Sequence, residues 1–115
     1  MNKIGAFCLT YGITIRNRIL EYLLENQGLD FAVGDISREL EISRPKTYEI
    51  INDFLNKSFI FKSRIIGKTQ LYILNKQSAR VKLFLKDFKE CLKIVVVEHS
   101  IKPKQRKTLK IVQQV

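Results

Sequence analysis

Two segments with helical character, separated only by a tight turn, constrain the fold of this chain more than any other feature of its sequence. The first is DISRELE, residues 35–41, and the turn falls at EIS. The second runs over residues 44–57 and begins after Ser43, a residue type that caps helix N-termini. Pro45 is tolerated in its first turn because the N–H groups there have no partner within the helix. So short a connection between two helices predicts a helix-turn-helix.

The second segment carries cations in its first turn, where the helix dipole repels positive charge. Arg44 and Lys46 each lose about a few tenths of a kcal/mol there, whereas a charge-assisted hydrogen bond to an anion contributes roughly 1.5–3 kcal/mol. Free N–H groups at a helix N-terminus also attract anions. The pair therefore indicates a phosphate or a guanine edge at this point. The alternative is that both cations only solvate an exposed turn.

The same segment divides into a buried face and an outer face. Five residues follow the i, i+3, i+4, i+7, i+8 spacing of a helix that packs on a core: Thr47, Ile50, Ile51, Phe54 and Leu55. The outer side then holds Arg44, Lys46, Tyr48, Glu49 and Asn52.

The flanking segments predict a further helix and a β-hairpin. Residues 14–28 begin with the capping residue Thr14 and carry one apolar helical face. Residues 59–65 and 70–74 are rich in β-branched and aromatic side chains, which predicts a hairpin turning near residues 66–69. Phe61 and Tyr72 in this hairpin are expected in the core.

Four cations and no acidic residue lie in the hairpin region from Ser58 to Lys76. The order helix, short helix, tight turn, helix and basic hairpin predicts a winged helix-turn-helix. The fold class is therefore α+β, mainly α with a small β-hairpin and a long C-terminal helix. The hairpin would be the wing, which lies on the DNA backbone or in the minor groove.

The long helix is predicted over residues 78–100, with Ser78 as its cap. Its apolar residues alternate at spacings of three and four, the pattern of a helix that pairs with another helix. We expect this seam to form a homodimer with two-fold symmetry. The alternative is that the helix folds back on the first helix of its own chain. The seam consists of Val81, Phe84, Leu85, Phe88, Cys91, Leu92 and Val95.

Composition supports a globular domain with a polyanionic partner. The chain has 115 residues, 45% of them hydrophobic, and a formal net charge of +10. We expect a DNA-binding domain over residues 1–77, the dimerisation helix over 78–100 and a basic tail over 101–115. The tail is a loose phosphate-binding arm, or its apolar end adds a strand or docks on the dimer partner.

Motifs for other classes of protein are missing from the sequence. The two cysteines are solitary and the single histidine stands outside any ligand spacing, so we expect neither metal nor cofactor. No glycine-rich phosphate loop and no hydrolase motif occurs, and we therefore predict that the protein is not an enzyme. The N-terminus lacks the pattern of a targeting segment or a membrane span, which favours a cytoplasmic, nucleoid-associated protein.

The stretch from about residue 11 to residue 88 resembles winged-helix DNA-binding regulators of archaea, near the MarR/ArsR-type superfamily. Three motifs carry the resemblance: LEYLLEN at 20–26, DISREL-x-ISRP-x-x-Y at 35–48, and G-x-TQLY at 67–72. It implies a dimeric, sequence-specific transcription factor. Two residues depart from the pattern. Glu41 stands where many relatives have glycine, and Glu49 stands where a cation or polar residue is usual.

The candidate DNA-binding residues come from the second helix of the helix-turn-helix and from the wing. Tyr48 and Asn52 are candidates for a base edge or a sugar, although Tyr48 is also a candidate for packing and Asn52 for simple exposure. Lys62 can face either side of the wing, and Arg16 and Arg18 are expected at the surface. The full set is Ser43, Arg44, Lys46, Thr47, Tyr48, Asn52, Lys62, Arg64 and Lys68.

Three functions fit these features. The first is a dimeric, sequence-specific transcription regulator that binds double-stranded DNA, with residues 43–57 in the major groove and the wing 59–74 on the backbone or in the minor groove. The second is a non-specific DNA-coating protein with a chromatin-like or plasmid-partition role. The third is an interaction module or RNA binder built on the same scaffold.

Overall fold

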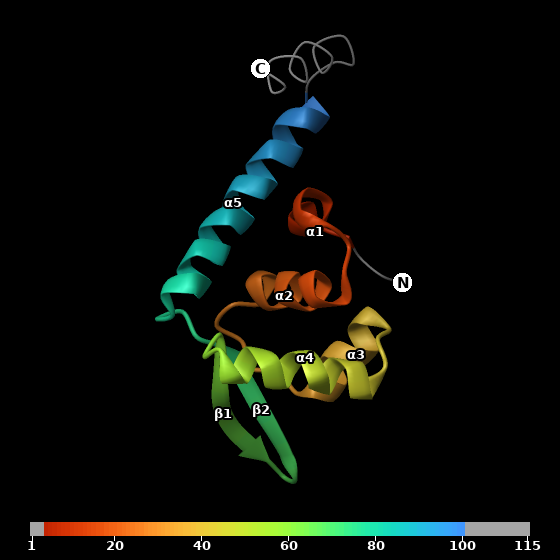
Figure 1. Cartoon of the computed structure of the whole chain (residues 1–115), viewed down its shortest axis with the longest axis vertical. Helices are drawn as coiled ribbons and strands as arrows, with labels where there is room; N and C mark the ends of the chain where they lie inside the picture. Colours follow the sequence, from red (N-terminus) through yellow and green to blue (C-terminus); the bar gives the residue numbers. More distant parts are fainter. Residues whose placement is uncertain (1–3, 101–115) are drawn as a thin grey trace.

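The computed structural model describes residues 4–100, and the basic tail predicted over 101–115 lies outside the described residues. Helices α2, α3 and α4 cluster together, the hairpin projects from this cluster, and α5 runs away from the cluster on the other side of the molecule (Figure 1). This is the α+β arrangement predicted from the sequence. In chain order the elements are α1 (Ala6–Tyr11), α2 (Ile15–Glu25), α3 (Val33–Leu40), α4 (Arg44–Asn56), β1 (Ile60–Ile66), β2 (Thr69–Leu74) and α5 (Ala79–Ser100).

The helix N-termini are set by the capping residues that the sequence suggests. At α2 the Thr14 hydroxyl accepts a hydrogen bond from the Asn17 N–H at 3.0 Å. At α4 the Ser43 hydroxyl accepts from the Lys46 N–H at 3.4 Å. Each bond satisfies one of the N–H groups that the first turn of a helix leaves without a partner.

The turn between α3 and α4 depends on a left-handed residue. Glu41 has φ 55° and ψ 46°, a conformation that costs a side-chain-bearing residue free energy relative to glycine. Ile42 then plugs the corner: its N–H donates to the Ser37 carbonyl at 3.0 Å, and its carbonyl accepts from the Ser37 hydroxyl at 2.6 Å. These bonds and the burial of Ile42 stabilise the turn that separates the two helices.

One hydrophobic core holds the helices and the base of the wing together. The predicted inner face of α4 is confirmed, because Ile50, Ile51 and Phe54 are buried and Leu55 packs against the core from its edge. Phe59 continues this core with ring contacts to Phe54 on one side and to Phe84 on the other, at 5.7 and 5.3 Å between centroids.

The wing is a two-stranded antiparallel hairpin as predicted, with a tight turn at Gly67 and Lys68. Gly67 has φ 61°, the left-handed conformation that glycine adopts without strain. Strand β2 also pairs with Phe31, whose N–H and carbonyl both bond to Tyr72 at 2.8 Å, so β1 is the free edge. The expectation that Phe61 is buried was wrong, because the strand leaves the core after Ile60 and half of the Phe61 side chain is exposed.

The sequence analysis did not predict α1, and this short helix changes the role of the seam on α5. Val81 and Cys91 are fully buried in the core of their own chain. Four further seam residues pack against the same core: Phe84, Leu85, Phe88 and Val95. The seam is therefore not a free surface. It folds back on α2, which is the alternative weighed above, and also on α1, which was not predicted. Leu92 alone among the seam residues is exposed.

A buried carboxylate explains why α1 docks where it does. Glu21, on α2, is 3% exposed and accepts hydrogen bonds from the Gly5 N–H at 3.0 Å and the Cys8 N–H at 3.3 Å. A negative group at the first turn of a helix is stabilised by the dipole as well as by these bonds. Gly5 has to be small, since a Cβ there would lie 2.5 Å from a Glu21 carboxylate oxygen.

Candidate nucleic-acid interface

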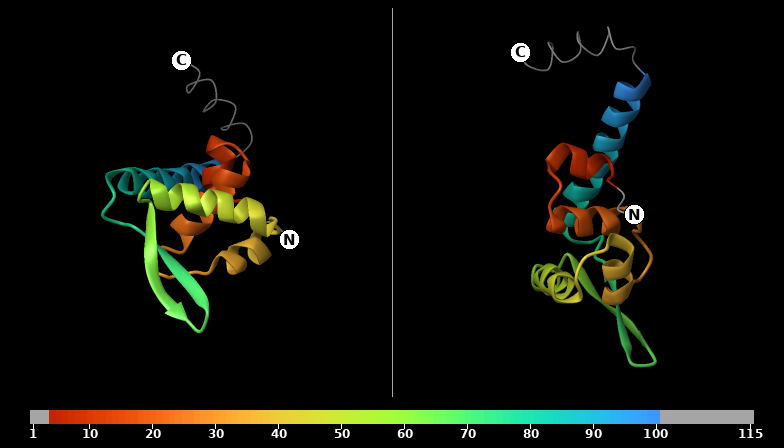
Figure 2. Two further views of the ribbon diagram at one scale, coloured as in Figure 1. Left: turned by 60° about the horizontal axis from the view of Figure 1, so that its bottom comes forward. Right: turned by 90° about the vertical axis from the view of Figure 1, so that its right-hand side faces the viewer.

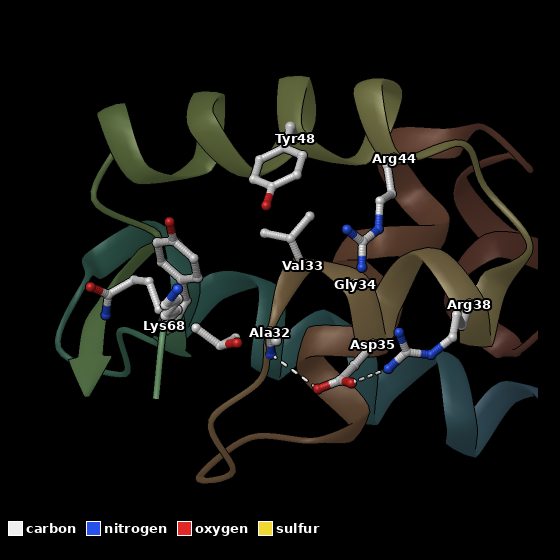
Figure 3. A pocket seen from close by; sticks show the side chains of 11 residues that line it. Ala32, Val33, Gly34, Asp35, Arg38, Arg44, Tyr48 and Lys68 are labelled. Carbon is white, nitrogen blue, oxygen red and sulfur yellow. Dashed lines mark hydrogen bonds and ion pairs between the residues drawn. The ribbon is translucent and has the colours of Figure 1, made fainter. Parts of the chain in front are cut away.

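A groove with a volume of about 390 Å³ lies between the start of α3, the outer side of α4 and the wing (Figure 3). We call it the basic groove. Three cations line it, namely Arg38, Arg44 and Lys68, together with the carboxylate of Asp35. Its remaining lining is Ala32, Val33, Gly34, Tyr48, Thr69, Gln70 and Tyr72. A cleft rich in charge of one sign focuses the field and attracts ions of the other sign.

Arg44 and Tyr48 are the contribution of α4 to the groove. They are one helical turn apart, so their side chains lie on the same face of the helix. Arg44 extends over Gly34 of α3, where a Cβ would lie 2.5 Å from the guanidinium nitrogen at the end of this side chain. Figure 3 shows the guanidinium pointing into the groove. Within residues 4–100 no acceptor or carboxylate pairs with Arg44.

The other cations near this face are partly neutralised. Arg38 pairs with Asp35 at 2.6 Å between nitrogen and oxygen, and Lys46 pairs with Glu49 at 2.8 Å. Each pair is exposed and joins two residues of the same helix, α3 for the first and α4 for the second. Such pairs contribute little to stability in water. An arriving phosphate would compete with these carboxylates, whereas Arg44 is available at once.

The wing contributes Lys68, Gln70 and Tyr72 from the side that faces α4. The strand register resolves the open question of Lys62, because Lys62 stands directly opposite Tyr72. Opposite residues share a face of the hairpin. Lys62 therefore lies on the same face of the wing as Tyr72, which lines the groove.

Arg64 belongs to the opposite face of the wing. Residues 63 and 64 form a bulge between the Lys62 and Ile65 pairings, and the Asp30 carboxylate accepts hydrogen bonds from the Ser63 hydroxyl at 2.9 Å and from Arg64 Nε at 2.8 Å. These bonds hold the pKa of Asp30 below its ordinary value. Since the Phe31 and Tyr72 rings share one face, alternation places the adjacent Asp30 on the other.

The structure thus brings three of the predicted residues to one cavity: Arg44, Tyr48 and Lys68. Lys46 and Asn52 lie on the outer side of α4 without lining the groove, and Ser43 is occupied in part by its capping bond. Thr47 is a correction: it is fully buried and its hydroxyl donates to the Ser43 carbonyl at 2.8 Å, so it does not reach this surface.

Arg38 and Gln70 are among the groove residues that the sequence analysis missed. Arg38 lies on α3, for which no site residue was predicted, and Gln70 was noted only as part of the wing motif. The spacing of Arg38 from the inward residues Ile36 and Leu40 marks it as outward-facing, but nothing local indicates that its face meets the wing.

Arg16 and Arg18 were expected at the surface, and the structure gives both a structural role instead. Arg16 forms an ion pair with Asp53 and lies 4.8 Å from the centroid of the Phe54 ring, which joins α2 to α4. Arg18 donates a hydrogen bond to the Leu40 carbonyl at the end of α3. Both side chains are half-buried, because α2 lies beneath the helix-turn-helix.

Two other kinds of site were sought in the part of the chain that the structure describes. No group of three or more His, Cys, Asp or Glu side chains there is placed to hold a metal ion. No helix between residues 4 and 100 is both long and apolar enough to cross a membrane.

Solved structures with the same architecture are winged-helix proteins, and this chain has a winged-helix fold. A mutant of ZitR from Lactococcus lactis superposes with a TM-score of 0.58 at 15% identity, covering 90% of this chain and 72% of that one. MepR, a transcription regulator of the Staphylococcus aureus multidrug efflux pump MepA, gives 0.58 at 18% identity over 95% of this chain and 82% of that one.

A mutant of S. aureus MepR bound to an oligodeoxyribonucleotide superposes with a TM-score of 0.56 at 15% identity, over 95% of this chain and 80% of the other. No family model matches the chain, and neither does any curated protein sequence. At such identities the likeness defines the fold. What the protein does has to be argued from its own side chains.

Proposed function

We propose that this protein is a DNA-binding transcription regulator that places α4 in the major groove and the wing on the adjacent backbone or in the minor groove. The observation that carries the proposal is Arg44, an unpaired guanidinium held over Gly34 and facing Lys68 across the basic groove. An unpaired guanidinium at the start of a helix is suited to a phosphate or a guanine edge. The net charge of +10 supports the same partner.

The residues divide into positioning and reading groups in this proposal. Arg38, Lys62 and Lys68 surround the groove and contact phosphates, which fixes the register of the protein on the duplex. Arg44 and Lys46 stand at the start of α4, where a helix in the major groove meets base edges first. Tyr48 and Asn52 follow at spacings of one helical turn each and reach a base edge or a sugar.

The proposal includes a homodimer formed through the end of the molecule that carries α1 and the C-terminal half of α5. Large apolar side chains are exposed on both helices there, and the helices contact each other. They are Leu9 at 62% exposed, Ile13 beside it at 59%, and Leu92, Ile94 and Val96 on α5 at 44, 45 and 65%. Several large apolar side chains exposed on neighbouring elements are typical of a protein interface.

A dimer on this surface would present two recognition helices to successive major grooves, roughly 34 Å apart along the duplex. The interface would be isologous, since the same patch of each copy meets its counterpart. Of the seam predicted from the sequence only Leu92 belongs to this interface, because the core of the same chain covers the other seam residues.

Selection of bound duplexes from a random library tests the function directly. A regulator recovers a common motif with two related half-sites, and footprinting of the recovered duplex then shows a protected region with defined limits. Recovery of unrelated sequences, with a footprint that spreads as protein is added, would show a DNA-coating protein instead. Retention of RNA with no binding to duplex DNA at moderate salt would contradict both.

A further inference from the structure

The tip of the wing carries two large apolar side chains that nothing in the described structure covers. Ile65 is 66% exposed and Ile66 is 54% exposed, and both precede the tight turn at Gly67 and Lys68. Figure 2 shows in two views that the hairpin projects beyond the helices, so its tip is the part of the wing farthest from the core. A hairpin tip that only connects two strands is typically polar.

The two isoleucines lie on opposite faces of the hairpin. Ile65 pairs with Gln70, Ile66 pairs with Thr69, and neighbouring residues of a strand point to opposite sides. A strand that packs on a flat surface is apolar on one face only. A tip that is apolar on both faces, and is two strands wide, suits insertion into a slot whose two walls are both apolar.

The charge near the tip indicates which kind of slot it could enter. Lys68 follows the isoleucines directly, and no acidic residue occurs in the sequence between Ser58 and Ser78. Arg64 precedes them and is paired with Asp30. The minor groove of a duplex has phosphates along its rims, and a base step that opens toward it presents the apolar faces of two base pairs as walls. Lys68 also lines the basic groove, so the tip and α4 approach the same ligand.

We infer that the wing tip inserts Ile65 and Ile66 into the minor groove, partly unstacks a base step and bends the duplex toward its major groove. This rests on the proposed function, since α4 has to dock before the tip reaches the DNA. Apolar wedges of this type separate base pairs and kink the helix by about 20–90°. Pyrimidine–purine steps such as TA unstack most easily, so the wedge adds a preference for such a step beside the site that α4 reads.

The test measures bending separately from binding. The duplex recovered by the selection, with a TA step beside the site that α4 reads, carries a donor and an acceptor dye at its ends, and a second copy carries 2-aminopurine at that step. We expect the unaltered protein to raise energy transfer between the ends and to raise 2-aminopurine fluorescence as the step unstacks. Anisotropy of a singly labelled duplex gives the affinity under the same conditions.

The informative variant is Ile65→Thr with Ile66→Thr, which keeps β-branched side chains in the strand and removes most of the apolar bulk. We expect it to lose both the gain in energy transfer and the fluorescence rise. Its affinity falls by no more than about tenfold, because the cost of unstacking disappears together with the apolar contact that offsets it. Phe61→Thr is the control: it removes an exposed apolar residue from the same strand away from the tip and leaves the bend unchanged.

Two results would overturn the wedge and leave the proposed function standing. The first is that the unaltered protein binds the duplex without bending it. The second is that the double variant bends the duplex as strongly as the unaltered protein does. If the double variant instead dissociates a dimer in sedimentation experiments, the tip pairs with a second copy and the wedge is wrong. If the unaltered protein binds no duplex at all, the proposed function fails and the wedge fails with it.

Discussion

The two ends of this molecule present opposite chemistry. At one end, α4 and the wing surround a groove with three cations and one carboxylate. At the other end, α1 and α5 expose large apolar side chains such as Leu9 and Val96. In the proposed function the first surface attracts a polyanion through a field that salt weakens, and the second associates through apolar burial that salt hardly affects. The comparison suggests that one end binds DNA and the other end joins two copies.

The largest expected effect comes from separating the two copies. Leu9→Glu with Val96→Glu places charge in the apolar patch, and we expect sedimentation equilibrium to give the mass of one chain instead of two. Because two linked DNA-binding surfaces gain avidity of about 10²–10⁴-fold, binding to a two-half-site duplex weakens by a factor in that range. Leu29→Glu is the matched control for the mass measurement, since Leu29 is 64% exposed and adjoins Asp30, which contacts the wing. An unaltered mass for the double variant would refute the dimer surface.

Removing the cations at the start of α4 is expected to have the next largest effect. Arg44→Ala with Lys46→Ala weakens binding about a hundredfold, at roughly 1–3 kcal/mol per contact, and leaves the melting temperature almost unchanged. Lys86→Ala with Lys89→Ala removes the same charge from exposed positions of α5 and is expected to weaken binding far less. Equal losses in the two variants would mean that net charge alone attracts DNA.

The salt dependence of DNA binding also tests which cations contact phosphates. The affinity of the unaltered protein should fall steeply as salt rises, because each neutralised phosphate releases counterions. Lys68→Ala should reduce the slope of log affinity against log salt by about one. A slope that Lys68→Ala leaves unchanged would remove Lys68 from the phosphate contacts.

At the apolar end of the molecule, the position of α1 is expected to depend on the buried carboxylate of Glu21. Glu21→Gln replaces one of the two carboxylate oxygens that accept N–H bonds from the start of α1, so it should lower the free energy of unfolding by about 1–3 kcal/mol. Chemical denaturation measures this loss. Glu39→Gln, at an exposed position of α3, is the control and should change stability little. Equal stability of the two variants would mean that these bonds do not hold α1.

The smallest expected effect concerns the ion pair behind the wing. Asp30→Asn frees Arg64 and removes a negative charge near the DNA, and we expect affinity to rise by about two- to fivefold, the range of an exposed ion pair. Asp53→Asn is the control, because its carboxylate pairs with Arg16 on a different side of α4. A fall in affinity for Asp30→Asn would show that the pair positions the wing for binding.

The same pair gives the wing a defined response to acid. The pKa of Asp30 is lowered in the folded protein, first by the hydrogen bond from Arg64 and then by that from Ser63. The contribution of this pair is therefore present above the ordinary pKa of 3.8 and is lost as pH falls through the lower, folded value. Side-chain NMR signals of Arg64 should follow this loss in the unaltered protein and show no such transition in Asp30→Asn.

Much of the fold could be predicted because its signals are local. Thr14 and Ser43 cap their helices through bonds to residues three positions later, and the inner face of α4 follows from residue spacing alone. Helix α1 could not be predicted in this way. It is six residues long, and the carboxylate that holds it comes from Glu21, thirteen residues beyond Cys8. Short helices form through tertiary packing rather than through propensity.

By itself, the sequence determined the helices that its periodicity and capping residues specify, the hairpin and the cationic character of one surface. Only the tertiary structure decided which of those cations act together. Arg38 and Lys68, thirty positions apart, meet across the groove, whereas Arg64 turns to Asp30 because a bulge redirects its strand. The physical reason is that helix and strand patterns are local properties of the chain, whereas a charged side chain takes its partner from whatever residues the packing brings within reach.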